Sequence, residues 1–117
     1  MHKFKDLIVY QKALKFTRLV RQSTKGFPKE ELFILTSQFR RAADSMVLNI
    51  AEGAGNRSKK EFCKFLDYSI RSAFECAGCL DIALENEMIS EEMHSKIMCS
   101  VNELIAMLDG LQKSLSR

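Results

Sequence analysis

Two cysteines and a histidine are the first residues of this sequence that could bind a metal or carry redox chemistry. Cys76 and Cys79 form a C-x-x-C pair. Structural zinc needs a second ligand pair at a matching spacing, and neither His94 nor Cys99 supplies one. Cys76 falls on the apolar stripe of a predicted helix and Cys79 lies off it, so both are interpreted as plain thiols. His2 is terminal, and His94 lies on the polar side of its predicted helix. We therefore predict no metal and no cofactor.

A glycine-rich segment, EGAGNR at residues 52–57, leads into a predicted helix start, which is a geometry that can bind anions. It does not match the phosphate-binding pattern G-x-x-x-x-G-K-S/T, and no predicted strand precedes it. We interpret it as a turn, with a phosphate contact through Arg57, Lys59 and Lys60 as the alternative. Because no nucleophile and base stand at a definite spacing, we predict that the protein is not an enzyme.

Positive charge is concentrated in the first part of the chain. Residues 1–71 hold 15 Lys and Arg against 7 Asp and Glu, whereas residues 72–117 hold 3 against 8. A polyanion responds to such a local field, so we predict a nucleic-acid-binding surface. Few exposed aromatic side chains accompany these basic residues, which favours contacts with the phosphate backbone of the nucleic acid over stacking with its bases. The candidate residues are Lys12, Lys15, Arg18, Arg21, Arg40, Arg57, Lys59, Lys60, Lys64 and Arg71, and the alternative is ordinary solubility charge.

Four amphipathic segments must position these residues. The apolar periodicity predicts helices over residues 6–24, with Asp6 as the N-cap, and over residues 28–52, with Leu32 on the apolar stripe. A third helix over 59–85 begins at a Ser58–Glu61 capping box, and a fourth begins after Ser90. We predict an all-α, antiparallel up-down four-helix bundle with a single domain over residues 1–117. Surplus apolar residues on the first helix predict self-association, namely Leu7, Ile8, Leu14 and Leu19.

The second helix carries a polar stripe beside its apolar face, formed by Gln38, Arg41, Ser45, Asn49 and Glu52. One interpretation is a solvated surface. The other is a buried or subunit-interface network, in which Arg41 and Glu52 pair across a neighbouring helix. Removing Arg41 from a buried pair would cost about 2–4 kcal/mol.

Several motifs resemble those of the bacterial four-helix-bundle family known as intervening-sequence proteins. Residues 35–53 read LTSQFRRAADSMVLNIAEG and residues 27–31 read FPKEE. Arg57-Ser58, Glu61-Phe62, Phe65-Leu66, and Ser72 with Glu75 also match, so the resemblance covers nearly the whole chain. Members are encoded within insertions in large-subunit ribosomal RNA genes of some bacteria, and elsewhere in bacterial genomes. The chain departs from the family at Arg71, where Gly is frequent, and at Val47-Leu48, where Pro is frequent.

The resemblance implies a ring-shaped homopentamer of up-down bundles with a poorly defined role in RNA binding. We therefore expect a non-enzymatic oligomer that binds structured RNA, and the alternative is a protein-protein adaptor or assembly scaffold with no nucleic-acid role. Expected partners are further copies of the chain and either RNA or another protein. We expect no membrane partner, because no apolar run approaches the roughly 18 residues that a membrane span needs. The N-terminal residues lack the features of a signal peptide, which predicts a cytoplasmic location.

Overall fold

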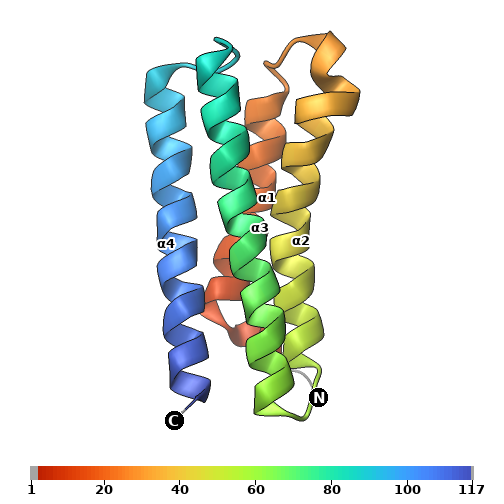
Figure 1. Cartoon of the computed structure of the whole chain (residues 1–117), viewed down its shortest axis with the longest axis vertical. Coiled ribbons are helices and arrows are strands. Elements are labelled where there is room, and N and C mark those ends of the chain that lie inside the picture. Colours follow the sequence, from red (N-terminus) through yellow and green to blue (C-terminus); the bar gives the residue numbers. More distant parts are fainter. Residues whose placement is uncertain (1–2, 117) are drawn as a thin grey trace.

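Four long helices follow one another up and down the long axis of the molecule (Figure 1). The computed structural model describes residues 3–116. The helices are α1 (Ile8–Thr24), α2 (Ser37–Ala54), α3 (Lys59–Glu85) and α4 (Glu91–Leu115). Within residues 3–116 there is no strand. The expectation of an all-α, four-helix fold is confirmed, and the pentameric ring stays a prediction.

Each helix packs against its neighbours in chain order, and α1 also contacts α4. As a result α1 and α3 occupy opposite corners of the bundle, and in Figure 1 α1 passes behind α3. The predicted apolar stripes meet in one core. On α1 this stripe consists of Val9, Ala13, Phe16 and Val20, all buried.

The surplus apolar residues of α1 divide into two pairs. Ile8 and Leu14 are 62% and 44% exposed. Leu7 and Leu19 pack against the core. Only the first pair is therefore free on the surface of one chain.

Two of the predicted helix starts are confirmed and one is wrong. The Ser58 hydroxyl accepts a hydrogen bond from the Glu61 amide, and the Ser90 hydroxyl accepts one from the Met93 amide. Asp6 is not an N-cap, because it belongs to a short 3-10 helix, η1 (Lys3–Asp6). The Leu7 amide donates to the Phe4 carbonyl over 3.0 Å, so α1 starts one residue beyond Leu7 without a side-chain cap.

The predicted single helix over residues 28–52 is interrupted near its beginning. A 3-10 helix, η2 (Lys29–Glu31), leads into a π-helix, η3 (Leu32–Thr36), and only then does α2 begin. A π-helix holds more residues per turn than an α-helix, so side chains before it lose register with the stripe that follows. Leu32 is therefore 44% exposed instead of buried, and Phe33 is 90% exposed.

No helix among the described residues is long and apolar enough to cross a membrane.

Candidate nucleic-acid interface

The ten predicted basic residues lie in two separate groups. Lys12, Lys15, Arg18 and Arg21 belong to α1, and Arg40 faces them from α2. Lys59, Lys60, Lys64 and Arg71 belong to α3, and Arg57 lies in the turn before it. Because α1 and α3 stand at opposite corners, these residues do not form one continuous surface.

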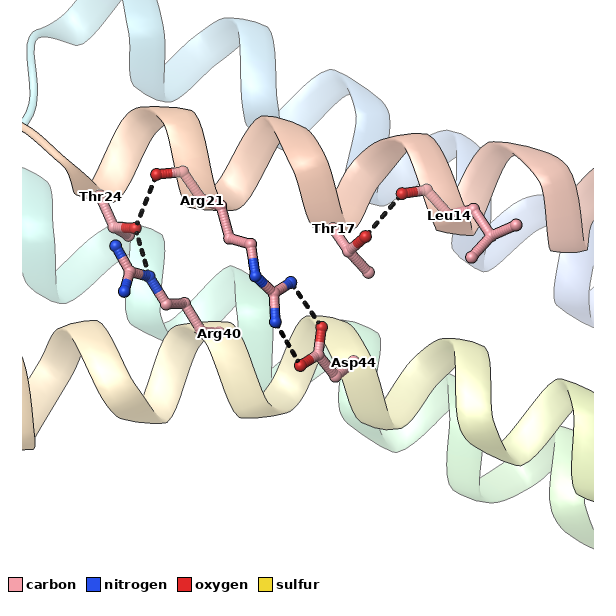
Figure 2. Close-up of polar contacts among 6 residues, drawn as sticks. All are labelled: Leu14, Thr17, Arg21, Thr24, Arg40 and Asp44. Carbon is pink, nitrogen blue, oxygen red and sulfur yellow. Dashed lines mark hydrogen bonds and ion pairs between the residues drawn. The ribbon is translucent and has the colours of Figure 1, made fainter.

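Three residues of the first group have polar partners within the bundle. The Lys12 ammonium lies 3.0 Å from Glu103 of α4. Arg21 forms two parallel hydrogen bonds of 2.8 and 2.7 Å with Asp44 of α2, which raise the pKa of Arg21 above its ordinary value. Arg40 donates through Nε to the Thr24 hydroxyl over 2.9 Å (Figure 2). Only Arg40 of the three lacks an acidic partner, counting every residue that the structure describes.

A row of polar side chains whose positive charges are not paired with carboxylates of the described chain follows the outer face of α1. Lys15, Arg18, Gln22 and Lys25 recur at spacings of three and four, are exposed, and have no hydrogen-bond or ionic partner in residues 3–116. Ten residues separate the first from the last, which corresponds to about 15 Å along a helix. An open groove of about 870 Å³ runs along this face, lined by Gln11, Leu14, Lys15, Thr17, Arg18, Arg21, Gln22 and Lys25.

Sequence reasoning missed Lys25. It follows the last residue of α1 and so stood outside the predicted helix, yet it continues the Lys15, Arg18, Gln22 series. Extending that spacing one step past the helix end would have found it.

The second basic group is partly neutralised. Lys64 lies 3.9 Å from Glu61, and the Arg71 guanidinium lies 5.7 Å from the centre of the Tyr68 ring. Arg57, Lys59 and Lys60 are exposed and have no partner within the described part of the chain.

The glycine-rich segment has a packing role at its first glycine. Gly53 is buried near the end of α2, and a Cβ atom there would lie 2.7 Å from Cβ of Phe65 and 3.0 Å from Cδ1 of Phe62. Glycine is required because α2 and α3 approach too closely for a side chain.

The polar stripe of α2 divides between a helix seam and open solvent. Gln38 donates to Glu75 of α3, Ser72 of α3 donates to Ser45 over 2.9 Å, and Asn49 donates back to Ser45. Arg41 and Glu52 are exposed and unpartnered in the described chain. They stand eleven residues apart, about 16 Å along the helix, so the two cannot pair within one chain.

A third hydrogen bond across the seam between α2 and α3 was not anticipated from the sequence. Ser69 of α3 is fully buried, and its hydroxyl donates to the Met46 carbonyl over 2.8 Å. Its place on the predicted apolar stripe of α3 was the available signal.

Cys76 is buried on the apolar stripe as predicted, whereas Cys79 and His94 depart from their predicted surroundings. Cys79, expected off the apolar stripe, is only 3% exposed and belongs to the buried core. Burial raises the pKa of the Cys76 thiol, and it raises that of Cys79 to about 11. The His94 side chain is only 16% exposed, and its Nε2 lies 2.9 Å from Asp81. Among the described residues no group of His, Cys, Asp and Glu could hold a metal ion.

Comparison with known proteins gives matches of two kinds, one to a sequence family and one to solved structures. The sequence profile of the 23S rRNA-intervening sequence protein family matches residues 5–110. A crystal structure at 1.70 Å resolution of a protein with unknown function, from the S23 ribosomal protein family of Bacteroides thetaiotaomicron VPI-5482, has a TM-score of 0.83 and 25% sequence identity. That match covers 93% of this chain and 98% of the other. Among curated proteins no relative matches the chain.

Proposed function

Because the chain belongs to the 23S rRNA-intervening sequence protein family, we propose that it is a non-enzymatic bundle protein that binds structured RNA through the outer face of α1. One observation carries the proposal: Lys15, Arg18 and Lys25 form an exposed row with no acidic partner among the described residues. Among the described residues, Lys12 is the one predicted basic residue that the acidic C-terminal part of the chain neutralises, through Glu103.

The proposed contacts go to phosphates and not to base edges. No tyrosine or phenylalanine lines the groove on α1, so stacking of unpaired bases has no platform there. Lysine and arginine side chains spaced along a helix suit the regularly spaced phosphates of a duplex or a folded strand. Binding of this type depends steeply on salt and little on sequence.

We further propose that the protein works as a homo-oligomer, as a pentameric ring, in the cytoplasm. Exposed Ile8, Leu14 and Leu48 support association, because monomeric proteins rarely leave such apolar area uncovered. Five chains of net charge +3 would carry +15 and repeat the α1 face five times. Repetition multiplies weak phosphate contacts without any new interaction.

A second candidate function is a protein-protein adaptor, and a different observation favours it. Leu32, Phe33 and Ile34 project from η3 at 44%, 90% and 64% exposure. An exposed aromatic side chain next to two aliphatic ones is typical of an anchor for a protein partner. The adaptor function predicts that RNA does not bind at physiological salt.

An RNA titration over several salt concentrations tests the leading proposal. The test variant is Lys15→Gln/Arg18→Gln, and the matched control Lys96→Gln/Lys113→Gln removes the same charge from α4. We expect the test variant to weaken binding and to flatten the plot of log affinity against log salt by about two units, one for each lost phosphate contact. The control should behave like the unmodified protein. No binding even at low salt, or equal losses in both variants, would overturn the proposal.

A further inference from the structure

A small pocket lies where the loop after α1 enters η2 and η3. It has a volume of about 130 Å³ and brings together three cationic side chains, Lys25, Lys29 and Arg40, with the hydroxyls of Thr24 and Thr36. Phe27, Pro28 and Leu32 supply apolar walls. Since a water molecule occupies roughly 30 Å³ of the liquid, this space suits a small ion of a few heavy atoms.

Arg40 is held at the pocket by one nitrogen and keeps its other donors free. Its Nε donates to the Thr24 hydroxyl, which itself donates to the Val20 carbonyl over 2.8 Å. The terminal nitrogens point away from Asp44, which is already occupied by Arg21 (Figure 2). The positive charge of Arg40 is therefore not neutralised by any carboxylate of residues 3–116.

Thr36 supplies a hydroxyl group to the pocket in addition to the three cationic side chains. The residue is only 3% exposed and lines the pocket. Its hydroxyl has no hydrogen-bond partner in the part of the chain that the structure describes. Because no fully buried polar side-chain atom of the described residues lacks a partner, this hydroxyl reaches the open space of the pocket and is free to bond to a group bound there.

We infer that this pocket binds one phosphate group as its dianion, either free or as a monoester. Arginine binds phosphate through paired N–H donors, and two lysines and a threonine hydroxyl supply further donors around the same space. Three positive charges between apolar walls favour a doubly charged phosphate over the singly charged diester of a nucleic-acid backbone. This pocket would thus bind a different group from the one that the outer face of α1 is proposed to contact, which is the phosphodiester backbone of RNA.

Inorganic phosphate is the first probe, titrated at pH 8 and constant ionic strength while the backbone amide signals are followed by NMR. We expect saturable shifts at Thr24, Lys29 and Thr36. The exposed Lys29→Gln change should weaken binding about tenfold, because it removes a charge-assisted contact. Lys96→Gln removes the same charge from α4, away from both basic groups, and should leave the affinity unchanged. Arg40→Gln also removes the hydrogen bond to Thr24. Its phosphate affinity is therefore compared only if its melting temperature equals that of the unmodified protein.

A second arm distinguishes the source of the phosphate. One RNA duplex is prepared with a 5′-phosphate and with a 5′-hydroxyl. If the duplex with a 5′-phosphate binds more tightly, and Lys29→Gln removes that advantage, the pocket binds RNA ends. If the two duplexes bind with equal affinity while inorganic phosphate still binds saturably, the pocket binds a small phosphorylated molecule. If RNA does not bind at all, the proposed function fails while the phosphate titration still stands. Shifts that do not saturate, or a loss of phosphate affinity in Lys96→Gln as large as that in Lys29→Gln, would overturn the inference.

Discussion

The seam between α2 and α3 is closed, whereas the seam between α1 and α4 is open. Between α2 and α3, Ser72 and Ser45 meet at 2.9 Å, and Gly53 lies against Phe62 and Phe65 with no room for a Cβ atom. Between α1 and α4, one ion pair of 3.0 Å joins Lys12 to Glu103 beside a cavity of about 270 Å³. The seam between α2 and α3 is therefore packed more closely than the seam between α1 and α4, whose hollows open to the surface.

Side-chain size explains the difference. The closed seam has Gly53, Ser45 and Ser72 at contact positions, and small residues let two helix backbones approach closely. The open seam has Phe16, Leu19 and Leu104 around its cavity, and a second cavity of about 360 Å³ is lined by Leu7, Ile8 and Met107 among others. The helix that carries the basic outer face, α1, packs less extensively against α4 than α2 does against α3.

The largest effect is expected from the replacement Gly53→Ala in the closed seam. The new methyl group would lie 2.7 Å from Cβ of Phe65, which cannot move without its helix. We expect the free energy of unfolding to fall by about 2 kcal/mol, as measured by urea denaturation.

Two other glycines provide the matched controls for this prediction. A Cβ atom at Gly78 of α3 or Gly110 of α4 would meet nothing within 4 Å. Alanine at either position should leave stability unchanged or raise it by up to about 1 kcal/mol, because glycine is a poor helix former. If Gly53→Ala proved as harmless as the controls, the α2–α3 seam would not be closed as described.

Much of this architecture was predictable, because helix periodicity and caps are local signals. The stripe of Val9, Ala13, Phe16 and Val20 and the Ser58 and Ser90 caps all follow from spacing alone. The π-helix was not predictable in this way. Periodicity assumes a constant number of residues per turn, so it placed Leu32 in the core although the structure exposes it.

The candidate site was less predictable, because charge compensation depends on packing between helices. Lys12 and Arg18 look equivalent in the sequence, yet only Lys12 faces an acidic residue of α4. Lys29 and Thr36, which join Arg40 in a pocket, are seven residues apart and separated by a change of helix type. In a regular helix, residues seven apart share a face but lie about 10 Å apart along the axis, so spacing alone does not place these two side chains around one small pocket.

The buried thiols of α3 give an intermediate effect that depends on pH. Cys76 and Cys79 lie within a few residues of Ser72 on the closed side of the bundle, and burial raises the pKa of both. Above about pH 9 the unfolded thiols ionise while the folded ones stay protonated, so unfolding releases protons. Their contribution to stability is thus complete below pH 9 and is lost as pH rises, for Cys79 until about pH 11.

Urea unfolding at pH 8, 9 and 10 measures this loss. Between pH 9 and 10 we expect the free energy of unfolding of the unmodified protein to fall further than that of a Cys76→Ala/Cys79→Ala variant, by about 1 kcal/mol for each thiol. The exposed Cys99 supplies the control, since Cys99→Ala should keep the pH dependence of the unmodified protein. If the free energy of unfolding changed with pH in the same way in all three proteins, the two thiols would not be shielded from water in the folded state.

The smallest effect is expected from Arg41→Ala at the outer edge of the closed seam. Arg41 is exposed and has no partner in the described chain, so its removal should change the free energy of unfolding of a single chain by less than about 0.5 kcal/mol. Ser72→Ala, which removes the hydrogen bond to Ser45 inside the seam, should cost about 1 kcal/mol and serves as the comparison. Measuring both variants at several protein concentrations separates chain stability from association. A loss of 2–4 kcal/mol for Arg41→Ala that grows with concentration would mean that another copy buries this edge and pairs Arg41 with an acidic side chain.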